Sequence, residues 1–314
     1  MNIVFFGSSE FATPVLKSLL TAQHKISCVV TQPDSKKGRG LSFTGTVIKK
    51  MAQDAGLKVY QPQAINTPEA VNFLKGLNAD LFIVIAYGQI LSQKILDLPK
   101  IFALNIHASA LPKYRGAAPI NWAIINGEKT TGITIMKMSD KMDAGNIIAQ
   151  KITEIDNNDT AVTLTDKLSN LAAELLLNHL RSIGNNDYKL TVQDEENVSF
   201  APKLKKEHGL IDWKKSADDI HNLIRGCAGW PGAFTHYQGK LLKIYKAGIV
   251  RGSGDEGIRV SGKILEVSRE GIVVACNKDN LVIQELQIEG KRRMTVEEFV
   301  AGHKISVGEI LGKK

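Results

Sequence analysis

The run Ile3-Val4-Phe5-Phe6-Gly7 decides the fold class of this chain, because a short apolar segment that ends at a glycine is typical of a strand buried on both faces. A helix-like stretch follows at residues 10–20, and a second apolar run covers 26–31. Further strand patterns lie at 58–60, 81–86 and 102–106, and a helix pattern lies at 67–77. This alternation predicts an α/β domain with an open, mostly parallel, Rossmann-like sheet that carries helices on both faces.

A second, smaller domain is predicted after about Pro202, where the sequence changes from alternating strand and helix patterns to mostly short strand patterns. Before this point the chain shows helix patterns at 119–125 and 160–183 and strand patterns at 132–138 and 147–155. After it come one helix pattern at 217–227 and strand patterns punctuated by glycine at 240–249, 262–267, 271–275 and 280–288. Short strands separated by turns are typical of a small β-barrel. We therefore predict one domain over residues 1–203 and an OB-like β-barrel domain over 204–314.

Composition narrows the class of protein. Of the 314 residues, 43% are hydrophobic and 23% are charged, as in ordinary globular proteins. The longest apolar runs are the size of strands, far below the roughly 20 residues of a membrane helix, so no membrane association is expected. The N-terminus lacks the features of a secretory signal, which predicts a cytoplasmic protein. The three cysteines, Cys28, Cys227 and Cys276, are far apart in sequence, so we expect neither disulfides nor a metal site.

The charge balance favours an anionic partner. The formal net charge is +8 and the pI is near 9.2. Phosphate groups attract Lys and Arg, so a nucleic acid is one candidate. Net charge by itself does not distinguish a nucleic-acid-binding protein from other basic proteins.

The most informative stretch is Asn105-Ile106-His107-Ala108-Ser109-Ala110-Leu111-Pro112-Lys113-Tyr114-Arg115-Gly116-Ala117-Ala118-Pro119. It leaves the carboxyl end of a predicted parallel strand, where open α/β sheets bind their ligands. Asn105 and His107 alternate with Ile106, so both side chains are expected on one side of the strand.

A second polar segment, Met138-Ser139-Asp140-Lys141-Met142-Asp143-Ala144-Gly145, forms a predicted turn with two carboxylates. A carboxylate beside an imidazole can stabilise its charged form and take part in proton movement. An amide and an imidazole together suit a developing oxyanion. The combination is compatible with acyl transfer to an amine without a covalent enzyme intermediate, since no serine or cysteine has an evident base beside it.

Each of these residues also has a structural interpretation. A single histidine near a strand end is often a hydrogen-bonded structural residue, and Asp140 and Asp143 are common turn formers. Pro112 and Pro119 suit the end of a strand and the start of a helix. The residues by themselves therefore indicate an α/β enzyme with a polar site and leave the reaction open.

Several motifs together resemble the 10-formyltetrahydrofolate-dependent formyltransferases. The string at 105–119 and Asp143-Ala144-Gly145 carry the resemblance. Other matching motifs follow in the expected order, so the resemblance covers nearly the whole chain: Phe5-Phe6-Gly7 with Phe11-Ala12-Thr13-Pro14, Thr31-Gln32-Pro33-Asp34 with Gly38-Arg39-Gly40, Ala86-Tyr87-Gly88-Gln89-Ile90-Leu91, Ala201-Pro202-Lys203-Leu204 and Ile211-Asp212-Trp213.

The resemblance implies roles for particular residues. Asn105, His107 and Asp143 match the family's catalytic trio, with Asn105 and protonated His107 stabilising an oxyanion and Asp143 orienting His107. Ser109, Ala110, Leu111 and Pro112 match the folate-contacting segment, where Ala110 replaces a more usual leucine. The implied formyl donor is 10-formyltetrahydrofolate, with no metal. Asp140 falls outside the trio as a turn residue.

The resemblance further implies an acceptor, the methionine carried by initiator tRNA. The basic, glycine-rich segment 34–41 matches a loop that meets the acceptor end of tRNA, so Lys36, Lys37 and Arg39 are the expected contacts. The second domain would then be the tRNA-binding one, because it collects basic residues at Lys203, Lys205, Lys206, Lys240, Lys243, Lys246 and 291–293. An amino-sugar nucleotide is the alternative acceptor. The family also implies a monomer.

Two other classes remain to be weighed. Gly7-Ser8-Ser9 after the first strand is a feature of dinucleotide-binding dehydrogenases, but the G-x-G-x-x-G motif is absent and no acidic residue ends the second strand. An inactive RNA-binding module with the same fold is the other alternative. The intact trio of Asn105, His107 and Asp143 argues against it.

Overall fold

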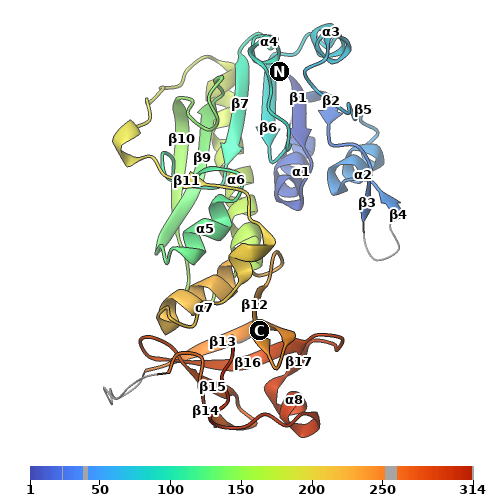
Figure 1. Cartoon of the computed structure of the whole chain (residues 1–314). Coiled ribbons are helices and arrows are strands. Elements are labelled where there is room, and N and C mark those ends of the chain that lie inside the picture. Colours follow the sequence, from blue (N-terminus) through green and yellow to red (C-terminus); the bar gives the residue numbers. More distant parts are fainter. Residues whose placement is uncertain (23, 38–41, 252–259, 313–314) are drawn as a thin grey trace. The chain divides into compact units, whose positions relative to one another are not determined.

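The computed structural model describes residues 1–22, 24–37, 42–251 and 260–312 (Figure 1). The chain forms two compact units. The first comprises residues 1–116, 130–153 and 165–201, and the second comprises 117–129, 154–164 and 202–314. The predicted division of the chain into a catalytic domain over residues 1–203 and a tRNA-binding domain over 204–314 stays a prediction.

A seven-stranded sheet organises the first unit, in the order β10-β9-β7-β6-β1-β2-β5. Its strands are β1 (Asn2–Gly7), β2 (Lys25–Val30), β5 (Val59–Tyr60), β6 (Leu81–Ile85), β7 (Phe102–His107), β9 (Thr130–Lys137) and β10 (Ile147–Glu154). The strands β5, β2, β1, β6 and β7, which are neighbours in this order, run parallel to one another. Strand β9 pairs with β7 antiparallel. The order β5-β2-β1-β6-β7 is that of a Rossmann sheet, so the predicted α/β class is confirmed.

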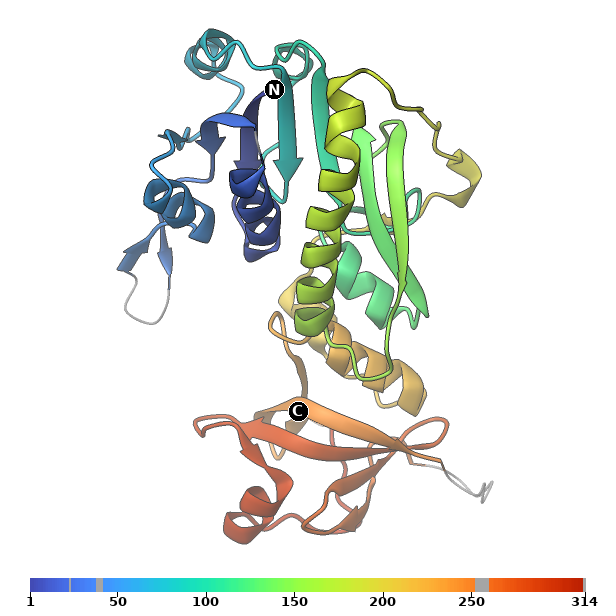
Figure 2. The same ribbon diagram turned by 180° about the vertical axis from the view of Figure 1, so that it is seen from behind.

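Both faces of this sheet are covered, as the apolar strand patterns predict. Alternate positions of β1 and β6, such as Phe6 and Phe82, pack in one cluster with residues of α3 (Pro68–Gly76) and α4 (Gln93–Leu96). The intervening positions, such as Phe5 and Ile83, are also completely buried. Figure 2 shows the long helix α6 (Ala161–Gly184) lying along the face of the sheet that is turned to the viewer.

The remaining elements of the first unit are short. They are η1 (Glu10–Ala12), α1 (Thr13–Thr21), the hairpin β3 (Ser35–Lys37) and β4 (Ser42–Thr44), α2 (Val47–Asp54), the pair β8 (Arg115–Gly116) and β11 (Phe200–Ala201), and η2 (Glu195–Asn197). The sequence analysis did not predict α2, whose start is marked by the Thr46 hydroxyl accepting from the backbone N–H of Lys49. No helix in the described part of the chain is long and apolar enough to span a bilayer.

Protonation of Asp80, the residue before β6, should lower the stability of the first unit at acidic pH. Its carboxylate accepts from the Asn2 N–H at 2.7 Å and from Lys100 Nζ at 3.0 Å. The Asn2 hydrogen bond, followed by that from Lys100, holds the pKa of Asp80 below its usual value. A lowered folded-state pKa contributes stability above the unfolded-state pKa, and this contribution is lost as the pH falls through the folded-state value.

We therefore expect the stability difference between wild type and Asp80→Asn to shrink on acidification from about pH 6 to about pH 3. Urea denaturation at a series of pH values measures it. A difference that stays constant over this range would contradict the prediction.

The second unit contains an antiparallel sheet in the order β12-β13-β16-β15-β14, with β17 paired to β16. Its elements are α5 (Pro119–Ile125), η3 (Lys206–Gly209), α7 (Ala217–Gly226), β12 (Ala233–Tyr237), β13 (Lys240–Val250), β14 (Ile264–Val267), β15 (Ile272–Ala275), β16 (Asn280–Ile288), β17 (Met294–Thr295) and α8 (Val296–Gly302). A capping box of Ser216 and Asp219 starts α7. The predicted C-terminal β-sheet domain is confirmed as an antiparallel sheet, the helix pattern at 217–227 forms α7, and α8 was not predicted.

One apolar core holds the second unit together. Ile220 and Ile224 of α7 pack with Leu242 of β13, Ile283 of β16 and Phe299 of α8. Strands with one face on such a core and one face towards solvent alternate apolar and polar residues. The strands of this unit could therefore be predicted from short strand patterns separated by glycine.

Candidate active site

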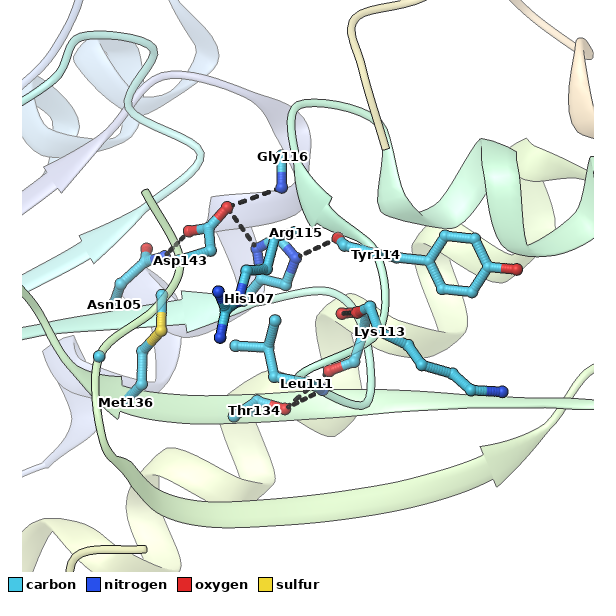
Figure 3. A network of polar contacts seen from close by, with 12 residues as sticks. Asn105, His107, Leu111, Lys113, Tyr114, Arg115, Gly116, Thr134, Met136 and Asp143 are labelled. Atoms are coloured by element: carbon cyan, nitrogen blue, oxygen red, sulfur yellow. Dashed lines mark hydrogen bonds and ion pairs between the residues drawn. The ribbon is translucent and has the colours of Figure 1, made fainter. Parts of the chain in front are cut away.

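Asn105 and His107 lie at the carboxyl end of β7 and point to the same side (Figure 3). Both side chains reach one residue, Asp143, in the connection between β9 and β10. The Asn105 amide Nδ2 donates to Asp143 Oδ1 at 3.2 Å, and His107 Nδ1 lies 3.6 Å from Asp143 Oδ2. The structure therefore brings together the three residues that the sequence proposed, although 38 residues separate Asn105 from Asp143.

The backbone around Asp143 explains how a residue so distant in sequence arrives here. Because β9 runs antiparallel to β7, with Met136 opposite Asn105, the chain passes the site and must fold back before β10 begins. Asp143 lies within this reversal with φ of 51°, in the left-handed region that non-glycine residues seldom occupy. Its Oδ2 also accepts from the backbone N–H of Gly116 at 2.9 Å. Three groups thus orient one carboxylate.

His107 is buried and has an oxygen beside each ring nitrogen. Nε2 is 2.9 Å from the carbonyl oxygen of Tyr114, and Nδ1 faces the Asp143 carboxylate. A carbonyl oxygen only accepts, so Nε2 carries a hydrogen. The Asp143 carboxylate is therefore the acidic group that faces the other ring nitrogen, Nδ1.

The segment from Ser109 to Pro112 forms a tightly bonded loop directly after β7. Ser109 Oγ donates to the Lys113 carbonyl at 2.6 Å, and the Ser109 carbonyl accepts from Thr134 Oγ1 at 2.7 Å. The Leu111 carbonyl accepts from Gln150 Nε2 at 2.9 Å. Ser109 and Leu111 are buried, whereas Ala110 and Pro112 are partly exposed. The loop is rigid and presents Ala110 and Pro112, rather than the Ser109 hydroxyl, to its surroundings.

The predicted tRNA-contacting residues are only partly covered by the structure. Lys36 and Lys37 lie on β3, opposite Phe43 and Ser42 of β4. Arg39 lies outside the described residues. Asp140, which the sequence analysis set aside as a turn residue, is exposed in the same connection as Asp143. Within residues 1–22, 24–37, 42–251 and 260–312, no three His, Cys, Asp or Glu side chains are grouped so that they could hold a metal ion.

The backbone partners of the trio were not predicted from the sequence. The Tyr114 carbonyl and the Gly116 N–H come from the loop that follows Pro112, and both residues have positive φ, 63° and 125°. At Gly116 a Cβ would lie 2.6 Å from the Ala201 carbonyl oxygen, so only glycine is accommodated. The glycine in Arg115-Gly116 was the available signal of a special backbone position.

This geometry can support chemistry in which negative charge develops on an oxygen. It combines an amide donor, a buried histidine beside a carboxylate, and a carboxylate able to receive a proton. The Ser109 hydroxyl nearby is buried and donates to a carbonyl oxygen, which does not suit it to act as a nucleophile.

Comparisons with known proteins agree with this chemistry. The family model described as "Formyl transferase" matches residues 1–180, and the model described as "Formyl transferase, C-terminal domain" matches residues 203–304. A methionyl-tRNA formyltransferase from Citrifermentans bemidjiense is 44% identical over 314 residues, covering 100% of this chain and 97% of that protein. The one from Caldanaerobacter subterraneus subsp. tengcongensis is 46% identical over 312 residues, covering 99% of this chain and 100% of its own length.

A solved structure shares the fold at lower identity. The crystal structure of WlaRD, a sugar 3N-formyl transferase in the presence of dTDP and 5-N-formyl-THF, matches with a TM-score of 0.66 and 24% identity. The match covers 93% of this chain and 99% of that one. With both family models in place over most of its length, and with relatives of more than 40% identity along the whole of it, the chain belongs to the formyltransferase family.

Proposed function

We propose that this enzyme transfers the formyl group of 10-formyltetrahydrofolate to the α-amino group of the methionine carried by initiator tRNA, in preparation for translation initiation. The observation that carries the proposal is the full-length identity of 44% to 46% with methionyl-tRNA formyltransferases. The likeness to the sugar-modifying enzyme extends to the fold alone, because only 24% of residues are identical.

The roles of the site residues in this reaction are part of the proposal. The neutral amine attacks the formyl carbon, and negative charge develops on the formyl oxygen. One amide hydrogen of Asn105 is bound to Asp143, and we assign the other to the formyl oxygen, beside the positive charge of protonated His107. Such prearranged donors stabilise developing charge because they need not reorganise during the reaction.

Proton transfer is assigned to Asp143. As the new C–N bond forms, the amine gives a proton to Asp143, and as the bond from the formyl carbon to N10 of the folate breaks, Asp143 passes that proton to N10. Asp143 can accept the proton while its second oxygen keeps its hydrogen bond to Gly116. We place the folate against the loop Ser109, Ala110, Leu111 and Pro112, whose rigid backbone suits a fixed binding surface.

For the tRNA we propose contacts from Lys36, Lys37 and Arg39, together with lysines of the C-terminal part. Arg292 and Arg293 are weaker candidates because ion pairs with Glu298 and Glu285 already neutralise part of their charge. Arg293 also lies over the Tyr245 ring, 4.5 Å from its centre. We therefore favour the lysines of β13, which are Lys240, Lys243 and Lys246. We further propose a monomer that acts in the cytoplasm, where translation begins.

A panel of acceptors tests the choice of substrate. The purified protein is incubated with 10-formyltetrahydrofolate and, in parallel, methionylated initiator tRNA, methionylated elongator tRNA, free methionine or an amino-sugar nucleotide. Formylation confined to the initiator tRNA is the expected result. Formylation of the sugar nucleotide alone would overturn the tRNA assignment while leaving the chemistry of the site in place.

A further inference from the structure

Gln193 lies in the segment between α6 and β11, buried to 4% exposure, and makes contacts behind the candidate site. Its amide Nε2 donates to two backbone carbonyl oxygens, those of Asp143 and Gly145, both at 2.8 Å. Its Oε1 accepts from Nε and Nη2 of Arg115, at 3.0 and 2.9 Å. Both amide hydrogens and both lone pairs are therefore used, which is the full hydrogen-bonding capacity of a glutamine.

Arg115 connects Gln193 to the other side of the site. Its two neighbours supply the backbone partners of the trio, since the Tyr114 carbonyl faces His107 and the Gly116 N–H donates to Asp143. The Arg115 guanidinium is itself buried, at 5% exposure, and its outer nitrogens pair with Glu195. Gln193 thus bridges the loop that holds Asp143 and the loop that faces His107.

The segment 191–201 that contains Gln193 is fastened on both sides. Thr191 and Ile147 exchange two backbone hydrogen bonds of 2.8 and 2.9 Å next to the Asp143 loop. At the other end Ser199 accepts from the backbone N–H groups of Tyr114 and Arg115, both at 2.9 Å. Gln193 is therefore a fixed support rather than a side chain on a free loop.

We propose that Gln193 is a positioning residue for the transfer step, which holds the Asp143 carboxylate against His107 and Asn105. The proposal rests on the proposed function for its kinetic test. Asp143 occupies a left-handed backbone conformation that costs about 1 to 3 kcal/mol and persists only where the surroundings enforce it. The two bonds from Gln193 to the carbonyls of Asp143 and Gly145 supply that enforcement. A glutamate here would repel both carbonyls, and a methionine would bind neither.

The kinetic test is Gln193→Met, which keeps the length of the side chain and removes the hydrogen bonds. We expect kcat to fall about tenfold to a hundredfold, because small displacements of a catalytic group have effects of this size, with KM for both substrates nearly unchanged. In a background of Asp143→Ala the same change should have little further effect, since the residue it positions is gone. An unchanged kcat, or an equal fall in both backgrounds, would refute the positioning role.

A matched control separates Gln193 from the rest of the Arg115 network. Glu195→Gln removes the negative charge of an exposed side chain that pairs with Arg115, and it leaves the bonds from Gln193 to the two carbonyls in place. Its kcat should stay within about threefold of wild type, because the glutamine oxygen can still accept a hydrogen bond from the guanidinium. A loss as large as that of Gln193→Met would place the effect on Arg115 and overturn the proposal.

Hydrogen exchange gives a test that does not depend on turnover. The Gly116 amide donates to Asp143, so in Gln193→Met it should exchange about tenfold faster relative to the amides of β6, as expected of a local opening. Unchanged exchange at Gly116 would overturn the proposal even if the enzyme proved active. Faster exchange would uphold the positioning role even if the chosen acceptor were not formylated. If the methionine variant does not fold, Gln193→Asn, which keeps an amide but shortens its reach, is measured in the same way.

Discussion

Replacing His107 or Asn105 with alanine is expected to lower kcat for formyl transfer by about a hundredfold or more, because each variant removes a group that we propose stabilises the developing oxyanion. His107→Ala also leaves the Asp143 carboxylate without its imidazole neighbour. Asn105→Ala removes one of the two hydrogen-bond donors to that carboxylate. Rapid-quench measurement of formyl-methionine formation under saturating substrates gives the rate directly.

Two matched variants show that such a loss is specific to the site. His179→Ala makes the same change on α6, where Nδ1 of the ring lies 2.9 Å from the Leu175 carbonyl oxygen, and kcat should stay within about twofold of wild type. Asp140→Ala alters an exposed carboxylate in the same connection as Asp143 and should also be nearly silent, unlike Asp143→Ala. Turnover close to wild type in His107→Ala and Asn105→Ala would contradict the assigned roles.

The second large effect is expected on folding, from Gly145→Ala. A Cβ at position 145 would lie 1.7 Å from the Lys137 carbonyl oxygen and 2.9 Å from the Lys137 carbonyl carbon, and backbone atoms at these distances cannot yield without moving a strand end. Relief requires separating β9 from the chain that returns to β10, where the Lys137 N–H now donates to the Asn146 carbonyl. We expect a loss of about 3 kcal/mol or more in the free energy of unfolding.

Chemical denaturation measures this loss, and Gly76→Ala is the matched control. Gly76 ends α3, and a Cβ there would meet nothing within 4 Å. Alanine is the better helix residue by about 0.5 to 1 kcal/mol, so this variant should be as stable as wild type or more so. If Gly145→Ala proved as stable as Gly76→Ala, the close approach of Gly145 to Lys137 would be wrong.

Local patterns in the sequence accounted for the framework of the site. Buried parallel strands carry continuous apolar runs, so strands could be predicted at Ile3–Phe6 and at the apolar residues just before Asn105. Alternation along β7 placed Asn105 and His107 on one side. The short helix α2 was missed because eight residues give too little periodicity, although Thr46 marks its start. What could be predicted was therefore the elements with strong local patterns.

The partners of the trio follow from long-range contacts, which no local pattern encodes. The left-handed backbone at Asp143 is enforced by Gln193, 50 residues further along the chain, through its bond to the Asp143 carbonyl. Likewise the close pairing of Gly116 with Ala201 depends on a segment that begins beyond α6. Asp143 itself was placed by resemblance to a family, because by spacing it was equivalent to Asp140 as a turn residue.

The most direct test of the central claim is a single incubation of the wild-type protein with 10-formyltetrahydrofolate and methionylated initiator tRNA, followed by mass spectrometry of the amino acid released from the tRNA. We expect formyl-methionine, formed at a rate proportional to enzyme concentration. Methionine that stays unformylated, with a folded protein and a donor shown to be intact, would contradict it.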